Sequence, residues 1–327
     1  MRPSEPAADG RDPDERAIDD APSDDAQSGQ ARPDEAGGAL GAGEGPLRTL
    51  RLELSFDGAR FAGWQRQAGE RSVQGEVEQA LDRVLGGTHS VLGAGRTDAG
   101  VHARRMVAST RTRSALPVAR LTTALDALLP RDVGVLRVSE AAPDFHALKH
   151  ARWKWYRYQL LEAPTRRPLE EARAWRRARL PPIEGLSAAA RALVGRHDFA
   201  AFASTGSSQK TSVRTILATR WSAVGRRRRF DVVGDGFLYK MVRTLVGTML
   251  EAAGAPDPEA EMRRVLEGRD RRAAGACVPA HGLTLMDVGY GRRPLPSWGS
   301  GPQAAGRGAP PADPGRVGRA DALPPSA

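Results

Sequence analysis

Cysteine is nearly missing from this sequence, since Cys277 is the only one among 327 residues. A single thiol excludes an intrachain disulfide and any metal cluster built on several thiolates. Such cysteine usage is typical of proteins that work in the reducing cytosol. We therefore expect a cytoplasmic protein.

Long apolar runs are also lacking. No stretch approaches the roughly 18 consecutive apolar residues that a membrane-spanning helix needs. The N-terminal region is acidic and has no apolar run, so it resembles neither a secretory signal nor an Arg-rich transit peptide. These absences predict a protein without a membrane partner.

Large apolar side chains are scarce at both ends of the chain. Residues 1–46 and 293–327 are rich in Pro, Gly and Ala, and the first segment also in Asp. Such segments cannot bury enough apolar surface to offset the entropy of ordering them. We predict that both are disordered tails.

Positive charge is abundant and unevenly distributed. Residues 1–46 hold 12 acidic and 4 basic residues, so residues 47–327 carry a net charge of +18, against +10 for the whole chain. This excess is typical of a surface that binds a polyanion, most often nucleic acid. Because 45 of the 49 basic residues are arginine, codon bias is an alternative source of part of it.

Two similar progressions of strands and helices occupy the segment between the tails. In residues 47–150, alternating leucines predict a strand over 49–56, and a helical period follows Ser72. Residues 151–292 repeat the mixture, with a long amphipathic helix expected over 237–254. The pattern predicts an α+β fold of two halves with a cleft between them.

The motif GAGRTDAGVHA at residues 93–103 places Asp98 close to Arg96 among small residues. Asp98 stands where a dinucleotide-binding turn needs its third glycine, so that type of site is disfavoured. A metal site on Asp98 and His102 lacks further ligands. A structural turn, with Arg96 in a surface ion pair, is a third interpretation.

The functional interpretation is a carboxylate nucleophile. Aspartates attack sugar-like carbons, a nearby guanidinium such as that of Arg96 keeps a carboxylate ionised, and small residues admit a bulky substrate. A hydrolytic glycosidase normally uses two carboxylates, whereas this motif supplies only Asp98. One carboxylate favours a rearrangement over a hydrolysis.

Seven segments, in order along the chain, resemble the TruA family of tRNA pseudouridine synthases. They cover about residues 48–291. The segments are SFDGARFAGWQRQ (55–67), SVQGEVEQAL (72–81), GRTDAGVHA (95–103), DFHA (144–147), KWYRY (154–158), FLYKMVRTLVGTML (237–250) and HGLTL (281–285).

The resemblance implies an isomerase that converts uridine to pseudouridine at positions 38 to 40, in the anticodon arm of tRNA. It implies no cofactor and no metal, a homodimer, and two ferredoxin-like halves around a basic cleft. Asp98 matches the family's catalytic aspartate, and Arg96 matches the arginine that engages it and helps displace the base. Tyr156 matches the tyrosine that stacks on the flipped uracil and is a candidate for proton transfer. Arg243 matches the arginine that pairs with the aspartate from the second half.

The chemistry agrees with these residue types. The uracil N-glycosidic bond breaks, the base rotates, and its C5 bonds to the ribose C1′. The residues are compatible with three roles for Asp98: addition to C1′, addition to C6, or help with proton loss at C2′. A base in a stem must first leave the stack, and stacking on an aromatic ring offsets part of that cost.

Four arginines near Asp98 in sequence are candidates for contacts with RNA phosphates. They are Arg104, Arg105, Arg111 and Arg113. The main rival function is a non-catalytic RNA-binding or RNA-chaperone protein, and an RNA glycosidase that releases uracil is a third option. A pure phosphate binder gains nothing from a carboxylate within its basic groove, which favours the enzyme.

Overall fold

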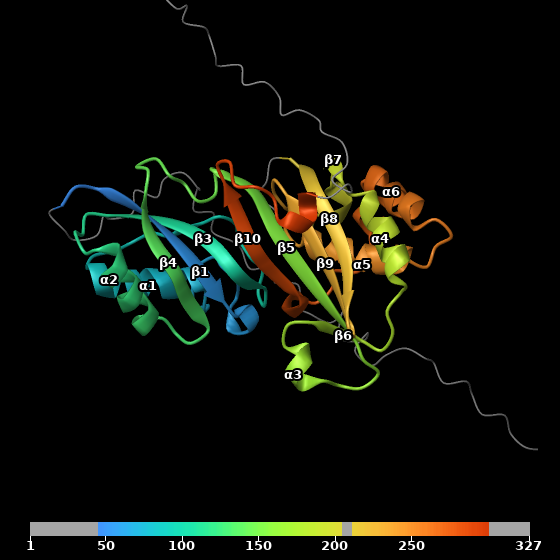
Figure 1. The fold of residues 1–327 in the computed structure, drawn as a ribbon, viewed down its shortest axis with the longest axis horizontal. Coiled ribbons are helices and arrows are strands. Elements are labelled where there is room, and N and C mark those ends of the chain that lie inside the picture. The colour runs from blue at the N-terminus through green and yellow to red at the C-terminus, as the bar shows by residue number, and fades with distance from the viewer. Residues whose placement is uncertain (1–44, 205–210, 301–327) are drawn as a thin grey trace, which may run out of the picture.

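The computed structural model describes residues 45–204 and 211–300, in a mixed α+β arrangement. The ten strands of this part form one sheet, in the order β4-β1-β3-β10-β5-β9-β8-β7, with β2 beside β3 and β6 beside β5 (Figure 1). The α+β prediction is confirmed. Of the two expected tails, residues 1–44 and 301–327 lie outside the described residues.

The first half of the sheet comes from the N-terminal part of the chain. Its strands lie side by side in the order β4-β1-β3-β2, which with two helices gives the ferredoxin-like arrangement. The elements are β1 (Arg48–Phe56), α1 (Val73–Leu85), β2 (Leu92–Gly93), β3 (His102–Thr112), α2 (Val118–Leu128) and β4 (Val133–Ala141).

The second half repeats this arrangement with additions. Strands β10-β5-β9-β8 lie in the same relative order, so the expected pair of ferredoxin-like halves is confirmed. The main elements are β5 (Ala151–Glu162), α4 (Ile183–Arg191), β8 (Val213–Val224), β9 (Arg227–Gly234), α5 (Met241–Ala252), α6 (Pro258–Gly268) and β10 (Leu283–Tyr290). The additions are α3 (Pro168–Glu171), β6 (Trp175–Arg177) and β7 (Gly195–Asp198). The division into domains at residue 150 stays a prediction, because the sheet is continuous across it.

Strand β10 joins the two halves. It pairs with β5 in antiparallel register from Leu283 to Tyr290. It pairs with β3 in parallel at only two positions, Thr284 with His102 and Leu285 with Ala103. Strand β2 also pairs with β3, but further along, where it meets Ser109 and Ala108. The loop from β2 to the start of β3 therefore lies at the place where the two halves meet (Figure 1).

The two faces of the sheet differ in chemistry. On β1, Leu50, Leu52 and Leu54 are fully buried in the core shared with the helices. Glu53 alternates with them and points to the other face, where both of its carboxylate oxygens accept hydrogen bonds from Arg105. This second face therefore carries an ionic network rather than an apolar core.

The expected helix over residues 237–254 begins four residues later than predicted. Helix α5 starts at Met241, because Lys240 has a left-handed backbone conformation with φ of 58°. Phe237 and Leu238 precede this break and belong to the connection from β9. No helix within residues 45–204 or 211–300 has both the length and the apolar character needed to cross a membrane.

The chain continues in an ordered form past residue 292. Residues Ser297–Ser300 form a short 3-10 helix. Trp298 packs against Trp155 with ring centroids 5.7 Å apart, and Arg293 forms an ion pair with Asp287. The first residues assigned to the C-terminal tail thus pack on the ionic face of the sheet.

Candidate active site

The loop that carries Asp98 is held by the segment after β1. The Trp64 amide donates to the Thr97 carbonyl at 3.1 Å. A Cβ atom on Gly58 would lie 2.0 Å from the Val101 carbonyl oxygen, and one on Gly63 would lie 2.5 Å from that of Thr97. Gly63 also has φ of +109°, a conformation that glycine adopts without strain. Two glycines in FDGARFAGW therefore allow the loop to lie directly on this backbone.

Asp98 forms an ion pair across the two halves of the fold. Its Oδ2 accepts a hydrogen bond at 3.0 Å from Nη1 of Arg243, which lies in the first turn of α5. The side chains are only 16% and 14% exposed, respectively. Arg243 is itself fixed, since its Nε donates to the Val278 carbonyl at 2.7 Å. Within the described chain, the second carboxylate oxygen of Asp98 accepts no hydrogen bond.

Tyr156 lies beside this ion pair on β5. The residue is buried, and its ring meets Phe237 edge to face with centroids 5.1 Å apart. Burial raises the pKa of the Tyr156 phenol, and the negative charge of Asp98 raises it further. The phenol therefore keeps its proton throughout the neutral range.

Arg96 occupies a different position from the one expected of a partner to Asp98. It is exposed, and in the part of the chain that the structure describes it makes no hydrogen bond or ion pair. The guanidinium that pairs with Asp98 belongs to Arg243. The motif at residues 93–103 thus places Arg96 at the surface of the loop, and the Asp98 carboxylate is held from the second half of the fold.

The four arginines expected to contact RNA differ in their surroundings. Arg105 is bound by Glu53 and Asp287 on the ionic face of the sheet. Hydrogen bonding to Glu53 raises the pKa of Arg105, so its charge is already matched. Arg104 and Arg111 are exposed, and Arg113 is half-buried.

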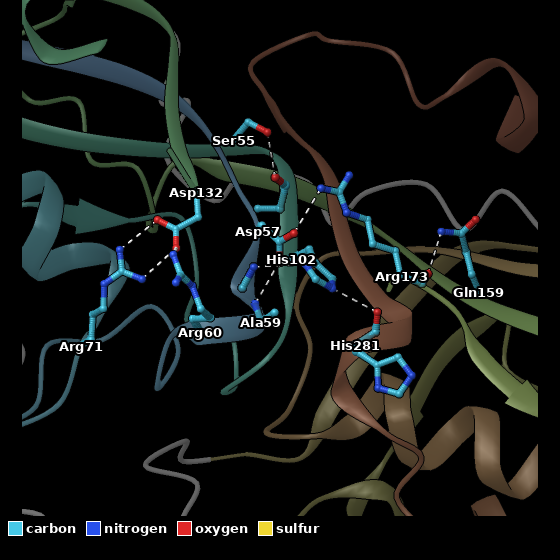
Figure 2. A network of polar contacts seen from close by, with 12 residues as sticks. Ser55, Asp57, Ala59, Arg60, Arg71, His102, Asp132, Gln159, Arg173 and His281 are labelled. Atoms are coloured by element: carbon cyan, nitrogen blue, oxygen red, sulfur yellow. Dashed lines mark hydrogen bonds and ion pairs between the residues drawn. The ribbon is translucent and has the colours of Figure 1, made fainter. Parts of the chain in front are cut away.

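His102 connects the end of the Asp98 loop to the second half. Its Nδ1 accepts a hydrogen bond from the Gly58 amide at 3.1 Å, and its Nε2 lies 3.1 Å from the His281 carbonyl (Figure 2). Burial lowers the pKa of His102, while the Asp57 carboxylate, whose Oδ1 lies 3.1 Å from Nδ1, opposes the change. This histidine has a structural role, and it lies outside the Asp98 ion pair.

A separate cavity of about 450 Å³ opens at the level of His102, and neither Asp98 nor Arg243 lines it. Figure 2 shows both carboxylates that line it in ion pairs, Asp57 with Arg173 at 3.3 Å and Asp132 with Arg71 at 2.8 Å. Neither carboxylate is therefore free to act as a nucleophile. We therefore place the candidate active site at Asp98 instead of at this cavity.

Two cations near the site were missed by sequence reasoning. Lys154 packs against Gly95 of the Asp98 loop, and Arg214 acts electrostatically on Lys154. Lys154 stands two positions before Tyr156 on a strand, so alternation alone places both side chains on one face. That signal was present in KWYRY, whereas nothing in the sequence singles out Arg214.

Comparison with known proteins gives one consistent family. A family model described as tRNA pseudouridine synthase matches residues 54–153 and 189–291. The chain is 41% identical over 245 residues to a tRNA pseudouridine synthase A of Pelobacter propionicus, covering 75% of this chain and 100% of the relative. It is also 41% identical over 244 residues to one of Syntrophotalea carbinolica, covering 75% and 97%. The first matched segment of the family model includes Asp98, and the second includes Arg243. Tyr156 lies just beyond the end of the first segment.

Proposed function

The chain belongs to the tRNA pseudouridine synthase family, and we propose that it isomerises uridines at positions 38 to 40 of the tRNA anticodon stem-loop, with Asp98 as nucleophile. The observation that carries the proposal is the ion pair between Asp98 and Arg243. It joins residues from the two halves of the fold at one partly buried point. The family and the isomerase activity are the premise, and the target uridines and the role of Asp98 are the proposal.

The geometry supports a nucleophilic carboxylate. Arg243 holds Oδ2 through a charge-assisted hydrogen bond from its Nη1 at 3.0 Å, which fixes the carboxylate in place. The other oxygen has no partner among the described residues, so it is the atom that attacks the substrate. Attack at C1′ displaces uracil as its anion, which takes the C–N bonding electrons. The base then turns and its C5 bonds to C1′ as the carboxylate leaves. The C5 proton passes to solvent, and N1 takes up a proton, so the product is an isomer of uridine.

Tyr156 is suited to the base rather than to the sugar. Its raised pKa keeps the phenol protonated, so it acts as a hydrogen-bond donor to the uracil while charge develops on the base. Its ring gives the flipped uracil an aromatic neighbour, which offsets part of the cost of unstacking. We propose Arg96, exposed on the same loop, as a residue that displaces the target base from the stem.

The substrate and the assembly follow from the same premise. We propose that the exposed Arg104 and Arg111, together with Arg113, contact tRNA phosphates. Arg105 is not part of this proposed contact, because Glu53 already matches its charge. A homodimer that binds the anticodon arm remains part of the proposal.

Tritium release from tRNA labelled at uridine C5 tests the proposal, because pseudouridine formation must expel that hydrogen. We expect wild-type enzyme to release it and Asp98→Asn to lose the activity by at least about 1,000-fold, with tRNA binding retained. Asp126→Asn, at an exposed position on α2, is the matched control and should keep full activity.

The outcomes separate the three functions. Binding by wild type without tritium release would contradict an enzyme and favour an RNA-binding protein. Release of free uracil would identify a glycosidase. Release by Asp98→Asn at the wild-type rate would show that another group is the nucleophile. Mapping the modified uridines in the product tRNA tests positions 38 to 40.

A further inference from the structure

A lysine reaches the Asp98 loop from the strand that carries Tyr156. Lys154 pairs with Gly234 of β9, and Tyr156 pairs with Val232. Alternation along β5 places the lysine and tyrosine side chains on the same face. A Cβ on Gly95 would lie 3.1 Å from the Lys154 Nζ, so the ammonium group lies against the backbone three residues before Asp98.

A second cation lies next to this lysine. Arg214, near the start of β8, packs along Gly236, where a Cβ would lie 3.3 Å from its Cδ and Nε atoms. Arg214 donates hydrogen bonds to the backbone carbonyls of Thr211 and Val213. Burial lowers the pKa of Lys154, and the positive charge of Arg214 lowers it further.

These two cations differ from most others near the sheet. Arg105, Arg157 and Arg243 each donate hydrogen bonds to a carboxylate. Across residues 45–204 and 211–300, neither Lys154 nor Arg214 makes such a bond. Asp235 attracts both electrostatically, but its Oδ1 accepts from the Thr215 amide at 2.9 Å. Among the described residues, no carboxylate accepts a hydrogen bond from either cation, so Asp235 offsets the positive charge here only in part.

A short backbone segment ties the cation pair to the site of chemistry. Gly234 pairs with Lys154, Gly236 supports Arg214, and Phe237 packs on Tyr156. Any group bound by the two cations therefore lies close to the base that Tyr156 contacts. Since like charges held together are unfavourable, an anion that enters this place relieves their repulsion.

We propose that Lys154 and Arg214 bind a backbone phosphodiester of the tRNA next to the flipped uridine. The inference rests on the proposed function and adds a substrate contact to it. A uridine that leaves the stem carries its flanking phosphates with it, and these are the anions that must come close to Asp98. Lysine and arginine contacts to phosphate position a nucleic acid without reading its sequence.

The ionisation of Lys154 gives the contact a characteristic pH dependence. Burial and Arg214 lower the pKa of Lys154 to about 8, while Asp235 opposes the change. The charged residues of the facing loop are Arg96, which is exposed, and Asp98, which pairs with Arg243. The lysine charge is present below about pH 8 and is lost above it, so the phosphate contact weakens as pH rises through that value.

The test measures tRNA affinity in the Asp98→Asn background, which prevents turnover. Lys154→Met keeps much of the side-chain volume and removes the charge. We expect it to weaken binding by roughly tenfold at 0.1 M salt and to reduce the slope of log affinity against log salt by about 1. Arg263→Met, an equal loss of charge on α6 (side chain 50% exposed), is the control and should change the affinity less than twofold.

Lys154→Arg supplies the second arm, measured in otherwise wild-type enzyme. An arginine stays charged at every pH used. The KM of Lys154→Arg for tRNA should therefore stay constant between pH 7 and 9.5, whereas the KM of wild type should rise above pH 8. If Lys154→Met has the same salt slope and the same KM as wild type, the proposed phosphate site is wrong, although the enzyme is active. If the wild-type enzyme releases no tritium, the proposed function itself is refuted. The melting temperature of Lys154→Met distinguishes both outcomes from unfolding. Removing a charge that burial disfavours should not lower that temperature.

Discussion

At the scale of single residues, the site depends on one arginine that makes two contacts at once. Arg243 donates through Nη1 to Asp98 and through Nε to the Val278 carbonyl. The second bond fixes the guanidinium, so the first one fixes the carboxylate. A point charge in the same place would attract Asp98 without orienting it.

Arg243→Lys separates charge from orientation. A lysine has one nitrogen at the end of a flexible chain and cannot reproduce both bonds in the same geometry. We expect the single-turnover rate of tritium release to fall by about 100-fold, with tRNA affinity nearly unchanged. Arg263→Lys on α6 is the matched control. A rate equal to that of wild type would show that the orientation of Asp98 does not limit the reaction.

The sequence identifies these residues to different degrees. Asp98 stands out from its own motif, because a carboxylate among small residues has few structural explanations. Arg243 is found only through the resemblance of its segment, since an arginine on an amphipathic helix has no local feature that indicates its partner. Arg96 stands only two positions before Asp98, yet its side chain is exposed and Arg243 makes the ion pair. Proximity along a loop does not decide where side chains point.

At the scale of elements, the position of the Asp98 loop follows from steric contact with the segment after β1. Gly58 is buried, and the Val101 carbonyl occupies the space where its Cβ would lie. The loop rests on backbone instead of on side chains, so backbone contact fixes its height above the sheet.

Gly58→Ala tests this contact. The added methyl group must displace backbone, so we expect a loss of about 2 kcal/mol in the free energy of unfolding and a lower rate of tritium release. Gly134→Ala on β4 is the control, because a Cβ there meets nothing within 4 Å, and its effect should stay within about 0.5 kcal/mol. Equal stability and activity of both variants in denaturant titrations and release assays would contradict the close contact.

Elements with a strong period were predictable from sequence. The leucines of β1 alternate and are fully buried, and Ser72 caps α1 by accepting the Gly75 amide, as a helix start requires. The start of α5 was not predictable, because it depends on the left-handed conformation of Lys240. Lysine gives no local sign of that conformation, and the surrounding fold imposes it.

At the scale of the whole molecule, stability depends in part on ion pairs between segments far apart in the chain. Asp132, which precedes β4, accepts two hydrogen bonds from Arg71, which precedes α1 (Figure 2). Hydrogen bonding to Arg71 lowers the pKa of Asp132 below its ordinary value of 3.8. A carboxyl whose pKa is lower in the folded state stabilises the fold above its unfolded pKa, and this contribution is lost as the pH falls through the folded value.

Asp132→Asn should therefore be less stable than wild type at pH 7, by about 1 kcal/mol for a partly exposed charged pair. The difference should shrink as the pH falls below 3.8, where the wild-type carboxyl takes up its proton. Thermal unfolding from pH 7 to pH 2.5 measures this, with Asp126→Asn as the control without an ion pair in the described chain. A difference that stays constant over that range would rule out the charge as its cause.

The place of β10 in the sheet has a consequence for how the protein is made. This strand is the last of the sheet to leave the ribosome, and it lies between β3 and β5. Until residues 283–290 emerge, no strand is present to join β3 to β5, even though Asp98 and Arg243 have both already been synthesised. We therefore expect the two residues to meet only after the final strand has folded, and a polypeptide that ends before β10 to be inactive on tRNA.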